Sequence, residues 1–227
     1  MDQGHFQSRA AAAMLELMGE SRGLMPSAAD LAERLGVSRA VLQDHCPDLD
    51  ALVIALAQDA LVTMGDSCVR AMVQADPSRP LEQVQALGRG YLQWVLDNPA
   101  HYRLLYDERT QRLATDPELI RQSTGIQRLI RNFMARAKEM GHLRNDTDVN
   151  LASVMAYSYA YGLARVAMMG PVTDYALRGE GGAGDPHAIL FAALDEGVRE
   201  LAIGAPNEAA AFADPSRPPD QPSRSEA

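Results

Sequence analysis

The chain has 227 residues, a formal net charge of −9 at pH 7, 47% hydrophobic residues and 5% aromatic residues. This length allows one large domain, or a small domain and a medium-sized one. The sequence contains no run near the roughly 20 uninterrupted apolar residues of a membrane helix, which disfavours a membrane-spanning protein.

Helix-forming residues dominate, and β-branched runs are scarce, so we predict an all-α protein. The first residues lack the basic and apolar regions of a signal peptide, which favours a cytoplasmic location. Cys46 and Cys68 do not have the spacing of a metal site or a disulfide framework. We find no phosphate-binding loop and no nucleophile elbow, and therefore expect no enzymatic activity, no metal and no cofactor.

The N-terminal residues predict three short helices. Residues 1–8 are expected to form a flexible arm, followed by an Ala-rich helix over Arg9–Glu20. Ser27 is placed to cap a helix over Ala28–Leu35, with Asp30 as its capping-box partner. Gly36 supplies the positive φ of a tight turn, and Ser38 caps a third helix that reaches Cys46. Four apolar side chains should pack against the first helix: Leu31, Leu35, Val37 and Leu42.

Longer amphipathic helices follow. Their apolar spacing and their Asp-Pro and Gly signals predict helices over 49–75, 81–97, 101–108, 117–141, 147–169 and 186–203. A Gly-rich loop occupies 179–184. We divide the chain into the arm (1–8), a helix-turn-helix domain (9–55), a helical ligand-binding and dimerisation domain (56–204) and a disordered tail (205–227).

Two short helices that meet at a glycine, with a small Ala32 at their crossing, are typical of a helix-turn-helix. The stretch Ser27–Arg39 (SAADLAERLGVSR), followed by His45, Pro47 and Ala51-Leu52, resembles the TetR/AcrR family of transcriptional regulators. The resemblance is good over the first 60 residues. Beyond them it consists of helix order and length, and a partial match of Ala160-Tyr161-Gly162 to a His-Gly motif.

The resemblance implies a dimer that binds double-stranded DNA and a small-molecule effector. The N-terminal residues of the second short helix would then lie in the major groove. Arg39 would pair with guanine or phosphate and Gln43 with adenine, whereas His45 would hold a phosphate or pack within the motif. The expected DNA-binding residues are Ser27, Ser38, Arg39, Ala40, Gln43 and His45.

Three positions depart from the family pattern. Gln43, Cys46 and Leu49 stand where such proteins usually carry a Tyr, a Phe and a Lys. The first 60 residues contain four arginines and nine acidic residues, and fewer phosphate contacts weaken DNA binding. The alternative is therefore a TetR-fold dimer with weak or lost DNA affinity that acts through protein or ligand binding. In that alternative Leu49 is exposed for a protein contact.

Aromatic and methionine side chains in the second half are candidates for a ligand pocket, although plain core packing explains each of them as well. The candidates are Tyr91, Trp94, Tyr102, Tyr106, Phe133, Met134, Met155 and Tyr159. A series of arginines would attract an anionic effector such as an acyl-CoA, or would form a solvated face: Arg103, Arg109, Arg112, Arg121, Arg128, Arg131 and Arg136. We therefore expect an apolar or an anionic effector.

The last two long helices predict the dimer interface. Two subunits would pair as a four-helix bundle, with Ala152, Ala156, Ala160 and Gly162 allowing close approach. The sequence as a whole predicts a ligand-responsive regulator, acting as a repressor on a near-palindromic operator.

Overall fold

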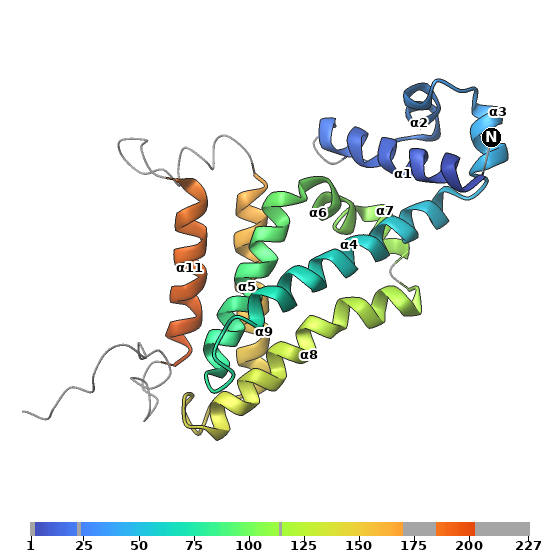
Figure 1. Cartoon of the computed structure of the whole chain (residues 1–227). Coiled ribbons are helices and arrows are strands. Elements are labelled where there is room, and N and C mark those ends of the chain that lie inside the picture. The colour runs from blue at the N-terminus through green and yellow to red at the C-terminus, as the bar shows by residue number, and fades with distance from the viewer. Residues whose placement is uncertain (1–2, 22–23, 114, 170–184, 203–227) are drawn as a thin grey trace, which may run out of the picture.

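The computed structural model describes residues 3–21, 24–113, 115–169 and 185–202, and within them all regular secondary structure is α-helical (Figure 1). This confirms the predicted fold class. The helices are α1 (Gln3–Glu20), α2 (Ala28–Leu35), α3 (Arg39–His45), α4 (Leu49–Met72), α5 (Pro80–Asp97), α6 (Pro99–Leu105), α7 (Glu108–Leu113), α8 (Pro117–Glu139), α9 (Val149–Ala167) and α11 (Pro186–Glu200). The predicted Gly-rich loop at 179–184 and the predicted tail at 205–227 lie outside the described residues.

Helices α1, α2 and α3 form the N-terminal helix-turn-helix group. The capping box between Ser27 and Asp30 is present, because each side chain accepts a hydrogen bond from the other residue's backbone N–H. Gly36 ends α2 with φ 67° and ψ 33°, and the Ser38 hydroxyl accepts from Val41 N at 3.2 Å. Side chains from all three helices form one buried core: Phe6, Met14, Leu31, Leu35, Leu42 and Cys46.

The first helix begins earlier than its sequence indicates. We predicted a flexible arm over 1–8, but α1 already includes residues 3–8. Phe6 is fully buried, and its ring centroid lies 4.8 Å from that of His45 on α3. The arm prediction is wrong for residues 3–8 because this tertiary contact stabilises a turn that Gly4 and His5 alone would not favour.

Helix α4 connects the N-terminal group to the rest of the molecule (Figure 1). It runs without a break across the predicted boundary at residue 55, and it packs against α5 and α8. By length and composition alone it would suit a membrane span, but its apolar face includes Val53, Leu56 and Cys68, which are buried in the helical core. The two predicted domains are thus joined by a shared helix.

The larger group consists of α4 with α5 and α8 packed against it, and of α9 and α11, which pack against α5 and against each other (Figure 1). Its core includes Leu81, Leu87, Phe133, Met134 and Leu143. Asp116, Asp148 and Asp185 cap α8, α9 and α11 through hydrogen bonds from backbone N–H groups to their carboxylates. The start of α9 is thus two residues later than the sequence indicated.

Two predictions about this region require correction. The single helix expected over 101–108 is two helices, because the chain breaks at Tyr106 and Asp107 accepts from Arg109 N at 2.8 Å to cap α7. Ala152 and Ala156 on α9, predicted to face a second subunit, are instead only 3% and 8% exposed inside their own subunit. They face inward because α9 packs against α5, α8 and α11.

Candidate functional site: recognition helix and internal cavity

The first turn of α3 is held to the N-terminal core by one side and open to solvent on the other. Leu42 is 2% exposed and anchors the helix. Ser38, Arg39, Ala40 and Gln43 are all exposed, although the Gln43 amide nitrogen also donates to Pro47 O at 3.2 Å. This is the surface that a major groove would meet if α3 acts as a recognition helix.

Charges around α3 leave little positive potential. Arg34 on α2 forms ion pairs with Glu16, at 3.2 Å, and with Glu20, both on α1. The hydrogen bond between Arg34 and Glu20 lowers the pKa of Glu20 and raises that of Arg34, because it stabilises the charged form of both groups, and the attraction of the opposite charges adds to this. Arg34 therefore connects α1 to α2. Arg39 is the exposed cation in the first turn of α3, and the last turn of the same helix carries an exposed Asp44.

The other predicted contact residues have structural partners. Ser27 Oγ donates to Asp30 Oδ2 at 2.6 Å within the capping box, and half-buried His45 packs on Phe6. Cys46 occupies the core position, and burial raises the pKa of its thiol. Leu49 was expected to be exposed in the alternative interpretation. It is half-buried and packs against the N-terminal core, so that expectation is wrong.

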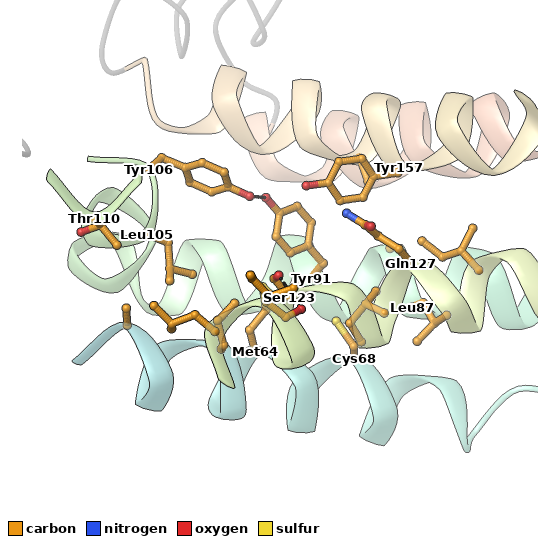
Figure 2. A pocket seen from close by; sticks show the side chains of 18 of the residues that line it. Met64, Cys68, Leu87, Tyr91, Leu105, Tyr106, Thr110, Ser123, Gln127 and Tyr157 are labelled. Atoms are coloured by element: carbon orange, nitrogen blue, oxygen red, sulfur yellow. Dashed lines mark hydrogen bonds between the residues drawn. The ribbon is translucent and has the colours of Figure 1, made fainter. Parts of the chain in front are cut away.

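A cavity of about 290 Å³ lies between α4, α5, α7, α8 and α9 (Figure 2). Its apolar wall includes Leu61, Met64, Cys68, Leu87, Leu119 and Ile130. Its polar lining groups are Tyr91, Tyr106, Thr110, Gln111, Ser123, Gln127 and Tyr157. Of these, Thr110 is 4% exposed, whereas Ser123, Gln127 and Tyr157 reach the solvent and mark the mouth.

Three tyrosines converge on one side of this cavity. The hydroxyls of Tyr91 and Tyr106 lie 3.4 Å apart, and Figure 2 shows the Tyr157 hydroxyl directed toward the same place. Burial raises the pKa of both Tyr91 and Tyr106, so that both stay protonated at neutral pH. Thr110 Oγ1 is buried and has no hydrogen-bond partner among the described residues.

The fold has close counterparts among solved structures. The TetR family transcriptional regulator PfmR from Thermus thermophilus superposes with a TM-score of 0.60 and 20% identity, covering 84% of this chain and 97% of that one. The ketosteroid transcriptional regulator KstR2 of Mycobacterium tuberculosis gives 0.60 and 20%, covering 88% and 94%. At these identities the likeness establishes the fold. In addition, residues 84–179 match the family model of the Tetracyclin repressor-like, C-terminal domain. Residues 84–179 are thus similar to the C-terminal domain of TetR-type repressors.

A further structure with this fold is RolR, solved in complex with the ligand resorcinol, with a TM-score of 0.52 and 19% identity over 94% of this chain and 95% of that one. Comparison with curated protein sequences gives no match. The family match covers α5 through α9, which contribute most of the cavity walls.

Of the eight side chains predicted to line a ligand pocket, Tyr91 and Tyr106 line the cavity. Four others are buried in the core away from it: Trp94, Tyr102, Phe133 and Met134. Met155 and Tyr159 are 51% and 44% exposed on α9. These six do not line the cavity. An apolar stripe in the sequence shows which face of a helix is buried, but it does not show whether that face packs against another helix or lines a cavity.

Sequence reasoning missed most of the cavity wall. Leu61, Met64 and Cys68 recur at three- and four-residue spacing on α4, a pattern that marks one helix face and was available in the sequence. Thr110 was missed for a different reason, since α7 itself was not predicted. Tyr157 lies one turn before Tyr161 on α9, and their rings are stacked with centroids 6.5 Å apart.

Proposed function

We propose that this chain is a ligand-responsive, DNA-binding transcriptional regulator that acts as a cytoplasmic dimer and represses transcription from a near-palindromic operator. The observation that carries the proposal is the exposed first turn of α3, held by the Ser38 cap and the left-handed Gly36 at the geometry of a helix-turn-helix. The solved structures with this fold include two transcriptional regulators.

The proposed effector site is the cavity of about 290 Å³ that α7 helps to line. RolR was solved in complex with resorcinol, and the proposal extends small-molecule binding to this chain. Helix α7 contributes Thr110 to the cavity, and the Arg109 guanidinium pairs with Asp50 at 2.6 Å in the first turn of α4. A ligand that favours one position of α7 would therefore bias the position of α4, which directly follows the helix-turn-helix.

The acidity of the N-terminal group favours a second candidate function, that of a TetR-fold dimer that binds a protein or a ligand but little DNA. With Arg34 engaged by two glutamates, few cations remain to neutralise phosphates. Leu49, which this alternative expected to be exposed, is half-buried, so one of the features that favoured the alternative is absent.

Selection of duplex DNA from a random pool by the immobilised full-length protein tests the proposal. We expect enrichment of a near-palindrome with half-sites about one helical turn apart, roughly 34 Å. Arg39→Ala should weaken binding to the selected DNA by about tenfold or more. Arg70→Ala, which removes an exposed charge from the last turn of α4, is the matched control and should change little. A folded dimer that enriches no sequence at low salt would favour the alternative.

A further inference from the structure

The lining of the cavity carries no formal charge. None of the described residues around it is a lysine, arginine, histidine, aspartate or glutamate. Three arginines nearby in sequence have partners outside the cavity: Arg109 pairs with Asp50, Arg121 with Glu118, and Arg136 donates to Pro77 O at 2.7 Å. An anionic group in the cavity would lose its hydration and gain no counter-charge, which is strongly unfavourable.

The polar groups of the cavity are nonetheless arranged to meet a ligand. One of the two hydroxyls of the Tyr91–Tyr106 pair donates to the other, which leaves a second O–H proton for a further acceptor. The amide of Gln127 also lines the cavity and is directed toward the tyrosine hydroxyls in Figure 2. Thr110 Oγ1, buried and unpartnered, is a second place where a ligand atom would satisfy a polar group.

The opposite wall is suited to an apolar body. Met64, Cys68 and Leu87 project from α4 and α5 on the side away from the tyrosine hydroxyls (Figure 2). The volume of about 290 Å³ sets the size of that body. An engineered apolar cavity of about 150 Å³ binds benzene, so about twice this volume accommodates two rings, or an aliphatic molecule of equal size.

We propose that the ligand of this cavity is an uncharged, largely apolar molecule of about two-ring size whose hydroxyl or carbonyl oxygen hydrogen-bonds to Tyr91, Tyr106 and Tyr157. This inference rests on the proposed function only in taking the cavity as the effector site. Between the apolar and anionic effectors that the sequence left open, it selects the apolar class, because the uncharged lining disfavours an anionic group held inside the cavity.

The test compares three molecules of nearly one shape: 2-naphthol, 2-naphthoate and naphthalene. Their binding to the full-length protein is measured at neutral pH by calorimetry, in the absence of DNA. We expect 2-naphthol to bind most tightly and naphthalene about three- to tenfold more weakly, since it forgoes one hydrogen bond. We expect 2-naphthoate to bind at least about a hundredfold more weakly, because its carboxylate must be desolvated.

Conservative variants locate the hydrogen bond. Tyr91→Phe and Tyr106→Phe each remove one hydroxyl and should weaken 2-naphthol about three- to tenfold while leaving naphthalene unchanged. Tyr159→Phe is the matched control, because Tyr159 is 44% exposed and lies outside the lining. It should leave the affinity for both molecules unchanged. Thermal unfolding of each variant confirms that the fold is retained.

The proposal is overturned if 2-naphthoate binds as tightly as 2-naphthol, if 2-naphthol does not bind, or if both hydroxyl deletions leave its affinity unaltered. The regulator function fails separately. A chain that shows the expected ligand order but selects no DNA would retain this ligand class and lose the assignment as a regulator. A chain that selects DNA but prefers 2-naphthoate would retain the assignment as a DNA-binding regulator and lose the proposed ligand class.

Discussion

At the crossing of α4 and α5, Gly90 leaves no room for a side chain. A Cβ atom at this position would lie 2.7 Å from Ser67 O and 2.8 Å from Cys68 Cα, both backbone atoms of α4. The Ser67 hydroxyl also donates to Gly90 O at 3.0 Å. Backbone atoms cannot rotate away as a side chain can, so the two helices would have to separate.

We therefore predict that Gly90→Ala lowers the free energy of unfolding by about 1–3 kcal/mol, as overpacking does in other cores. Urea unfolding followed by circular dichroism measures the change. Gly65→Ala is the control, because no atom lies within 4 Å of its added Cβ, and it should be neutral or stabilising by up to about 1 kcal/mol. Equal stability of Gly90→Ala and the wild type would show that the crossing is looser than described.

Cys68, in the cavity wall, makes the stability depend on alkaline pH. Burial raises the pKa of its thiol from 9.0 to about 12. The unfolded chain therefore loses this proton at lower pH than the folded chain, and the unfolded state binds fewer protons over that interval. The contribution of the thiol to stability is complete below about pH 9 and is lost as the pH rises toward about 12.

The urea midpoint should accordingly fall across this pH interval, and Cys68→Ala should fall less steeply, although it starts from a lower stability. A residual decline remains in the variant, since Tyr91 and Tyr106 also have raised pKa values from burial. Parallel pH profiles for the two proteins would mean that the thiol titrates normally in the folded chain.

Local rules predicted the N-terminal residues well and the cavity residues poorly. The Ser27–Asp30 box, the left-handed Gly36 and the Ser38 cap each depend on neighbours within three residues, so the sequence sufficed to predict them. Trp94 and Tyr106 look alike in an apolar stripe, yet one packs in the core and the other lines a cavity. That difference depends on which helices meet there, information that no single helix contains.

Helix α7 is the element on which the proposed coupling depends. In six residues it places Thr110 in the cavity wall, Arg109 against Asp50 on α4, and Leu113 against the N-terminal core. The Arg109–Asp50 pair is partly exposed, so its direct contribution to stability is at most about 1 kcal/mol. Its importance would be in the connection it makes between the cavity and α4.

We predict that Arg109→Gln preserves 2-naphthol binding and DNA binding but reduces, about threefold or more, the factor by which 2-naphthol lowers DNA affinity. Fluorescence anisotropy of the selected DNA, with and without 2-naphthol, measures this factor. Arg112→Gln is the control on the same helix, because Arg112 pairs only with Glu108 on α7 itself among the contacts described. An undiminished factor in Arg109→Gln would place the coupling elsewhere.

The sequence did contain a signal for α7. Asp107 followed by Glu108 is a typical helix start, with a capping carboxylate and an acidic first turn. The prediction nevertheless joined these residues to the preceding helix, because α6 and α7 are both too short to show a clear apolar period. The long helices α4, α5 and α8 were predicted correctly to within a few residues, since each spans several turns of one stripe.

On the scale of the whole molecule, one face of the larger helical group remains apolar and uncovered. It consists of exposed side chains on α9 and α11: Leu151, Val154, Met155, Tyr159 and Ile189. Each of them is at least 44% exposed, although they stand on two long helices that pack against each other. An uncovered apolar face shared by two helices is typical of a protein interface, and the proposed dimer would bury it in a four-helix bundle.

Val154, at 60% exposure, lies on this face, and Val154→Arg would place two unpaired charges in the interface of a two-fold dimer. We expect the dimer dissociation constant to rise about a hundredfold or more, since each buried unpaired charge is costly. Light scattering with size-exclusion chromatography measures the mass. Val62→Arg, at a 47% exposed valine of α4, should remain dimeric. If both variants stay dimeric, the subunits pair through another face. If Val154→Arg becomes monomeric and still binds the selected palindrome with full affinity, DNA binding does not require two linked recognition helices.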